Sequence, residues 1–151
     1  MVSARARGFT VVEVLVVMAV FAIVAGLAGP ALSEMVANQQ VRAAAYDLHA
    51  ALTIARSEAL TRNSAVTVAP VGGDWARGWS LTEAGGTVLR RQNAYPRVSL
   101  SGPSQVIFSG DGRPDSTATP FGITSSGASA TSYRCVRLRL AGRPAIDKGA
   151  C

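Results

Sequence analysis

The sequence predicts an α+β protein in which one long N-terminal helix packs on a small antiparallel β-sheet domain. Three observations indicate this class. An apolar run lies near the N-terminus, a segment rich in helix-forming residues continues to position 62, and short alternating segments separated by Gly and Pro fill the remainder. We therefore divide the 151 residues into four parts: 1–8, 9–29, 30–62 and 63–151.

The second part predicts a membrane anchor. From Phe9 to Gly29 there are 21 residues, of which only Thr10 and Glu13 are polar. A helix rises about 1.5 Å per residue, so a run of this length crosses the roughly 30 Å hydrocarbon core of a bilayer. Arg5 and Arg7 precede the run, and the next basic residue is far downstream. This asymmetry predicts a single-pass helix with a cytoplasmic N-terminus.

Glu13 is the exceptional residue of the anchor. A carboxylate in a bilayer costs several kcal/mol, which makes it a functional hypothesis by default. Two plainer interpretations exist. Glu13 lies shallow enough to reach the headgroups of an ordinary anchor, or the stretch is a cleaved secretory signal peptide. The length of the apolar run disfavours the signal peptide.

Residues 30–62 are expected to continue the helix as an amphipathic segment. Positions 31–62 lack Gly and Pro and are rich in Ala, Leu, Gln, Arg and Glu. Gly26, Gly29 and Pro30 are the expected points of bending, and Asn63-Ser64 ends the helix. One narrow apolar stripe, on which alanines let a sheet approach closely, has helical spacing: Val41, Ala44, Leu48, Leu52, Ala55 and Ala59.

The last part, 63–151, predicts a β-rich domain. We expect strands at 65–70, 79–82, 87–92, 98–100, 105–108 and 134–140, with Pro70 stopping the first and Gly72-Gly73 forming a turn. The stretch 110–130 is expected to be a surface loop whose residues 121–123 dip into the sheet. Trp75 and Trp79 are expected to cap the core of the sheet, the alternative being exposed platforms that stack nucleotides.

The two cysteines predict a disulfide. Cys135 and Cys151 both lie near the C-terminal end, in a domain that we expect outside the cytoplasm. In an oxidising compartment a disulfide is the default, and a loop of this size contributes roughly 3 kcal/mol. Two free thiols are the alternative.

The sequence shows no nucleophile with a suitable base, no metal-ligand spacing and no cofactor loop, so we expect neither enzymatic activity nor a metal or cofactor. His49 is the single histidine and is expected to face solvent on the helix. Asp111 and Asp115 provide too few ligands for a calcium loop. With 15 basic and 9 acidic residues the net charge is +6, which suits an acidic partner but does not establish one.

The basic residues of the C-terminal segment form a candidate ligand site. Because alternate residues of a strand share a face, Arg137 and Arg139 should lie on the face of Cys135, with a turn presenting Arg143 beside them. Val136, Leu138 and Leu140 should then face the core. Such a row suits phosphate groups, and a solvated face that protects an edge strand is the alternative. The segment contains five basic residues and one acid, Asp147: Arg134, Arg137, Arg139, Arg143 and Lys148.

The N-terminal motif resembles that of a known family. Arg7-Gly8-Phe9-Thr10-Val11-Val12-Glu13 is similar to the class III signal of type IV pilins and type II secretion pseudopilins. The resemblance implies that a prepilin peptidase cuts between Gly8 and Phe9, and that Phe9 is then N-methylated. Residues 1–8 are then a prepilin leader. It further implies that Glu13 pairs with the N-terminal amine of a neighbouring subunit, which would neutralise the buried carboxylate.

Residues 51–63, which read ALTIARSEALTRN, resemble the GspH/FimT branch of these proteins. This implies the pilin fold and a minor pilin or pseudopilin of the bacterial inner membrane, with a periplasmic C-terminal domain. Such a subunit assembles with other pilins and helps to initiate or cap a type IV pilus or type II secretion pseudopilus.

The same branch suggests a second possibility, DNA capture for uptake. Its FimT-type members carry a C-terminal Gly-Arg-x-Arg pattern implicated in DNA binding. Here Gly142, Arg143 and Pro144 match the first three positions, whereas Ala145 stands in place of the second arginine. The DNA-binding residues would then be Arg137, Arg139 and Arg143.

Overall fold

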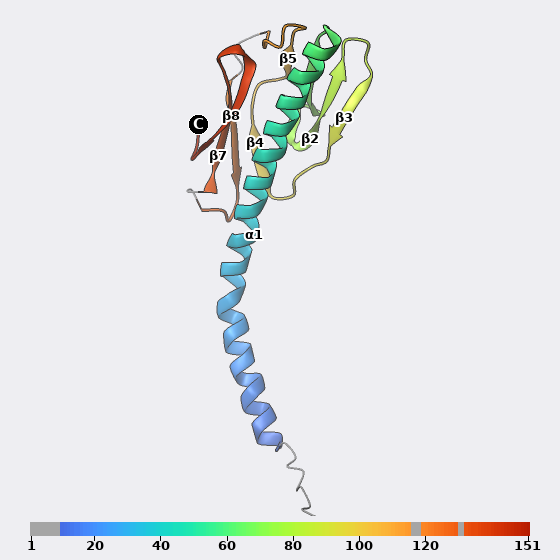
Figure 1. Cartoon of the computed structure of the whole chain (residues 1–151). Helices are drawn as coiled ribbons and strands as arrows, with labels where there is room; N and C mark the ends of the chain where they lie inside the picture. Colours follow the sequence, from blue (N-terminus) through green and yellow to red (C-terminus); the bar gives the residue numbers. More distant parts are fainter. Residues whose placement is uncertain (1–9, 116–118, 130–131) are drawn as a thin grey trace, which may run out of the picture. The chain divides into compact units, whose positions relative to one another are not determined.

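The computed structural model describes residues 10–115, 119–129 and 132–151. It contains one long helix and eight strands within these ranges (Figure 1), which confirms the α+β class. The chain divides into two compact units, Met1–Ser33 and Glu34–Cys151, and the helix contributes to both. The elements in chain order are α1 (Val11–Arg62), β1 (Val66–Val71), β2 (Asp74–Glu83), β3 (Val88–Gln92), β4 (Val98–Ser101), β5 (Val106–Phe108), β6 (Phe121–Ser125), β7 (Arg134–Arg139), the 3-10 turn η2 (Leu140–Gly142) and β8 (Arg143–Lys148).

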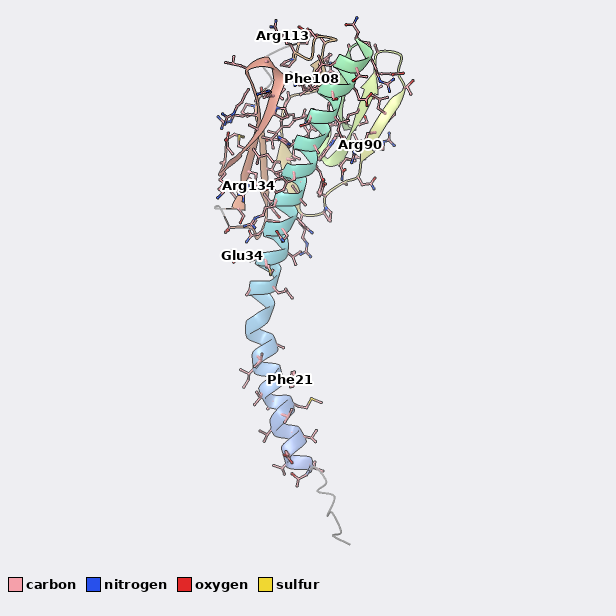
Figure 2. All side chains as sticks on the ribbon, in the orientation of Figure 1. Phe21, Glu34, Arg90, Phe108, Arg113 and Arg134 are labelled. Atoms are coloured by element: carbon pink, nitrogen blue, oxygen red, sulfur yellow. A yellow bond between two sulfur atoms is a disulfide. The ribbon has the colours of Figure 1, made fainter. Side chains whose placement is uncertain are left out.

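The first unit exposes its apolar side chains. Val11, Leu15 and Phe21 are exposed along this part of α1, and Figure 2 shows Phe21 projecting from the helix. The helix is long and apolar enough to cross a membrane, by length and composition. A row of large apolar side chains is unfavourable in water, so this surface favours an apolar environment.

The second unit buries one face of α1. All six residues of the predicted stripe from Val41 to Ala59 are fully buried, which confirms the amphipathic assignment. This part of the helix, cyan to green in Figure 1, lies across the sheets. The helix ends at Arg62, since Asn63 adopts a left-handed φ of 48° and Ser64 donates a backbone hydrogen bond to Ala59 at 3.2 Å.

The first sheet, sheet A, has the strand order β3-β2-β1-β5, and all neighbouring strands are antiparallel. Gly72 and Gly73 form the two-residue turn between β1 and β2, with positive φ values of 63° and 79°. The prediction that Pro70 stops the first strand was wrong. β1 continues to Val71, and proline is tolerated because β5 pairs only with residues 66–68 and leaves Pro70 an open edge.

The second sheet, sheet B, has the antiparallel order β4-β6-β7-β8. Two of its strands correct the sequence analysis. The predicted loop contains β6, in which Phe121 and Ile123 point into the core and Gly122 separates them. The expected turn at 141–144 ends at Gly142, because β8 begins at Arg143; Ile146 of this strand lies opposite Val136.

Leu140 also differs from expectation. Instead of continuing β7 into the core it begins η2 and is 95% exposed. Ala141 has a φ of 61°, so the chain reverses there and directs the leucine away from the core.

The core lies between α1 and the two sheets, and both tryptophans belong to it. Trp75 and Trp79 are buried, which confirms the core interpretation rather than exposed stacking platforms. Trp75 packs edge-on against Phe121 with ring centroids 4.9 Å apart, and its indole N–H donates to the Pro103 carbonyl oxygen at 2.7 Å. The one polar atom of this buried side chain therefore has a partner.

Candidate functional site

The first candidate site is the beginning of α1. Thr10 caps the helix, because its Oγ1 accepts a hydrogen bond from the Glu13 backbone N–H at 3.2 Å. Glu13 is exposed in the first turn, where the helix dipole favours a carboxylate. Its neighbours one turn further along the helix, Val16 and Val17, are exposed valines. The first unit thus carries one carboxylate on an otherwise apolar stretch of helix, and burying this carboxylate unpaired would be costly.

Gly8 and Phe9, the predicted processing residues, lie outside the described residues.

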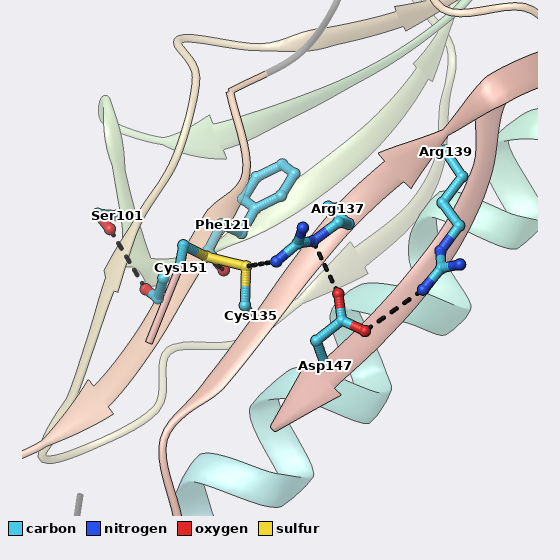
Figure 3. The surroundings of a disulfide bond; sticks show 8 residues. Ser101, Phe121, Cys135, Arg137, Arg139, Asp147 and Cys151 are labelled. Atoms are coloured by element: carbon cyan, nitrogen blue, oxygen red, sulfur yellow. Dashed lines mark hydrogen bonds and ion pairs between the residues drawn. A yellow bond between two sulfur atoms is a disulfide. The ribbon is translucent and has the colours of Figure 1, made fainter. Parts of the chain in front are cut away.

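The second candidate site is the outer face of sheet B around the disulfide (Figure 3). Cys135 on β7 is bonded to Cys151 with a Cα–Cα distance of 5.1 Å, which confirms the predicted pairing. Cys151 Sγ lies 3.2 Å from the Phe121 carbonyl oxygen. The disulfide therefore holds the last residue of the chain against β6 and fixes β7 beside it.

Arg137 and Arg139 share one carboxylate on this face. Arg137 Nε lies 2.7 Å from Asp147 Oδ2, and Arg139 Nη2 lies 3.4 Å from Asp147 Oδ1. Arg137 also donates to Cys135 Sγ at 3.6 Å. Asp147 occupies this position because β8 pairs it with Cys135, a register that the sequence analysis missed together with the strand. The predicted row of arginines exists, but its charge is partly neutralised.

Arg143 differs from the other two arginines. It lies opposite Arg139 in the β7–β8 register, is exposed, and has no ion-pair partner among the described residues. Because Arg139 already pairs with Asp147, Arg143 carries the unpaired charge of these two opposed arginines. Ala145, which replaces the second arginine of the pattern, lies opposite Arg137, so an arginine is present on the neighbouring strand at that point.

Two further titratable residues, His49 and Tyr95, lie on or beside α1. His49, which was expected to face solvent, is half-buried on α1. No group of three or more His, Cys, Asp or Glu that could hold a metal occurs among the described residues. Tyr95 donates its hydroxyl hydrogen bond to Asp47 on α1. Burial raises the pKa of the Tyr95 hydroxyl above its ordinary range, and the hydrogen bond to Asp47 raises it further. No pattern in the sequence singles out this contact, because the two residues lie on separate elements.

A capped apolar helix with one carboxylate in its first turn, followed by a helix segment packed on antiparallel sheets, defines a type IV pilin-like protein. Residues 3–29 match the prokaryotic N-terminal methylation motif, and residues 44–142 match the family described as Type II transport protein GspH. The chain belongs to the GspH family. Members of this family are structural pilin subunits.

The fold is similar to that of a solved minor pilin. Crystal structures of the type IV minor pilin FimU of Pseudomonas aeruginosa, strain PAO1, in two crystal forms match with TM-scores of 0.62 and 0.60. The sequence identities are 23% and 25%, over 72% and 70% of this chain and 89% and 91% of the FimU chains. No curated protein sequence matches significantly.

Proposed function

We propose that the chain is a minor pilin or pseudopilin that helps to initiate or cap a filament assembled at the bacterial inner membrane. Before assembly the protein spans the membrane once, with a cytoplasmic N-terminus and a periplasmic β-rich domain. The observation that carries this proposal is Glu13, placed in the first turn of an apolar helix within the matched methylation motif.

The role of Glu13 follows from the energetics of charge. A lone carboxylate among apolar helices costs several kcal/mol, whereas one paired with a cation is tolerated. Cleavage after Gly8 creates such a cation, the amine of Phe9, on every processed subunit. We propose that Glu13 pairs with the N-terminal amine of a neighbouring subunit. This ion pair would set the register in which the apolar helices of the two subunits pack.

Processing provides the direct experiment. The full chain is co-produced with a prepilin peptidase, and its mass is measured after extraction from membranes. We expect a chain that begins at Phe9 and carries one added methyl group, and a Gly8→Ala variant that retains the leader. An unprocessed wild-type chain would contradict the proposal.

A second candidate function is DNA capture, and the opposed pair Arg139 and Arg143 favours it. Phosphate oxygens accept from guanidinium groups in bidentate fashion, and such binding weakens steeply with salt. Arg143 offers its full charge, whereas Arg137 and Arg139 share Asp147.

Gel retardation of duplex DNA by residues 32–151 tests this candidate. Arg143→Glu should weaken salt-sensitive binding about tenfold, and Asp147→Asn should strengthen it because two arginines are released. Arg90→Glu, a charge reversal on β3 of sheet A, is the matched control. Equal DNA affinities of the wild type and these three variants would exclude this role for the arginines.

A further inference from the structure

One end of sheet B gathers basic side chains from three places in the sequence. β6 runs toward the segment that connects it to β7, and β7 runs away from that segment, so Arg134, the first residue of β7, lies at this end. Lys148 of β8 lies opposite Arg134. Arg97 immediately precedes β4, which is antiparallel to β6 and therefore begins at the same end. Because neighbouring strands lie about 4.8 Å apart, these residues are spread over roughly 15 Å of the sheet.

The same end of sheet B contacts α1 close to the start of the second unit. The Ser129 backbone N–H, in the segment between β6 and β7, donates to Asn38 Oδ1 at 3.1 Å. Arg42 follows Asn38 by one helical turn and is exposed. Figure 2 shows Arg134 and Glu34 at one end of the unit and Arg113 at the other. We call the four basic residues of this end, which are Arg42, Arg97, Arg134 and Lys148, the basic end.

The basic end keeps an excess of positive charge. Arg134 is half-buried, and its guanidinium donates to the Tyr133 carbonyl oxygen at 2.8 Å. The other three basic residues are exposed and form no ion pair among the described residues. The adjoining part of α1 carries two carboxylates, Glu34 and Asp47, and Asp47 already accepts a hydrogen bond from Tyr95. An excess of this sign attracts an anionic surface.

The backbone presents Arg97 at a cost. Its φ of 66° lies in the left-handed region, where a residue other than glycine is strained. Such strain persists only where the surroundings determine it. Here the hydroxyl of buried Ser125 donates to the Arg97 carbonyl oxygen and holds this conformation. A position that suits glycine therefore carries an exposed, fixed arginine at the end of the sheet.

The apolar part of α1 joins the second unit at this end. The first unit ends at Ser33, and Asn38 lies five residues further along the chain. Five residues reach at most about 18 Å even when fully extended, so the basic end stays close to the end of the anchor in any arrangement of the two units. Between these points Met35 is 62% and Val36 43% exposed, and exposed apolar side chains beside basic ones suit the boundary between lipid headgroups and acyl chains.

We propose that the basic end binds the phosphate groups of anionic phospholipids at the surface of the membrane that the anchor spans. Guanidinium groups bind phosphate oxygens in bidentate fashion, and lysine adds a point charge. The occupant follows from the same chain, because its apolar helix is long enough to cross a membrane and leads directly to these cations. The inference rests on the membrane span of the proposed function and adds a second contact with lipid, which assembly into a filament must break.

Photo-cross-linking of the full chain in lipid nanodiscs tests the proposal. Ser126, the exposed residue after β6, is changed in the variant Ser126→p-benzoyl-phenylalanine, and cross-linked lipid is measured by mass spectrometry. The yield in phosphatidylglycerol discs should exceed that in phosphatidylcholine discs about fivefold or more, and high salt should remove the difference. Leu140→p-benzoyl-phenylalanine, at the exposed far end of β7, is the matched control and should give little lipid cross-link in either disc.

Charge variants show which residues make the contact. Arg97→Gln and Lys148→Gln, made separately in the Ser126→p-benzoyl-phenylalanine chain, should each lower the yield in phosphatidylglycerol discs about fivefold, the effect of one basic residue near an anionic surface. The two changes lie on different elements, so a folding defect in one leaves the other as the test. Arg113→Gln removes a cation that is 75% exposed at the opposite end and should leave the yield unchanged.

The outcomes separate this inference from the membrane span. A chain that inserts into the discs but cross-links equally to both lipids, or equally from positions 126 and 140, overturns the inference alone. A yield that neither Arg97→Gln nor Lys148→Gln lowers overturns it as well, and so do cross-links to added duplex DNA in place of lipid. A chain that does not insert into the discs overturns both the inference and the membrane span of the proposed function.

Discussion

Tyr95 connects the helix to sheet A. Its hydroxyl donates a hydrogen bond to Asp47 on α1 and accepts one from Gln92 Nε2 at 2.9 Å. Its ring stacks on Trp79, with ring centroids 6.0 Å apart. Because the ring contacts the core and the hydroxyl contacts a helix carboxylate, this one residue fixes the loop after β3. Its contribution should depend on the protonation of the hydroxyl.

The substitution Tyr95→Phe tests that dependence. At neutral pH the variant should lose about 1 kcal/mol, the value of one hydrogen bond. The folded pKa is raised above the ordinary 10.0, so above that pH the unfolded chain ionises first and the wild type loses stability. The difference between the two proteins in urea denaturation should therefore shrink as the pH rises above 10.0. A constant difference would contradict the assignment.

At the scale of elements, the alanines of α1 determine how closely the sheets approach. Ala44 and Ala55 are fully buried on the packed face, whereas Ala50 is exposed on the same helix. Ala44→Leu should destabilise the second unit by about 1–3 kcal/mol because the added side chain has no space. Ala50→Leu, the same change on the exposed face, should change the free energy of unfolding by less than about 0.5 kcal/mol. Equal effects would show that this face is not packed as described.

The disulfide secures the end of the chain to β7 across a sequence separation of 16 residues. Cys151→Ser should lower the free energy of unfolding by about 3 kcal/mol, as expected from the loop entropy of the unfolded chain. A reductant should lower the stability of the wild type by a similar amount and leave the variant unchanged. Denaturant titrations with and without reductant measure both effects, and a reductant-insensitive wild type would contradict them.

The elements differ in how well the sequence predicts them. The helix was predictable to its end, because its apolar stripe is continuous and Asn63 interrupts it. β6 was missed because Gly122 divides a short apolar alternation within a segment rich in Ser and Thr. β8 was missed because Pro144 follows a turn and because its inward residues, such as Ile146, are only partly buried.

The candidate site too was only partly predictable from the sequence. The cysteine pair and the arginine row follow from local sequence. The neutralising contact of Asp147 depends on the pairing of β7 with β8, and the exposure of Leu140 depends on the backbone at Ala141. Neither is encoded by a pattern within one segment.

At the scale of the whole molecule, the two units have complementary physical requirements. The second unit contains the entire buried core among the described residues, while the first exposes its apolar surface and one carboxylate. In the proposed function, a membrane would cover the apolar surface before assembly, and helices of other pilins would cover this surface and neutralise the charge afterwards. The proposed function would therefore account for a small folded domain that carries a long apolar helix.

Incorporation into filaments tests the central claim most directly. Filaments are sheared from cells that produce the wild-type chain, Glu13→Ala or Gly8→Ala, and the amount of the chain in them is measured by immunoblot against its amount in membranes. We predict that the wild type is incorporated, that Glu13→Ala is processed but remains in the membrane, and that Gly8→Ala is neither processed nor incorporated. Normal incorporation of both variants would contradict the account.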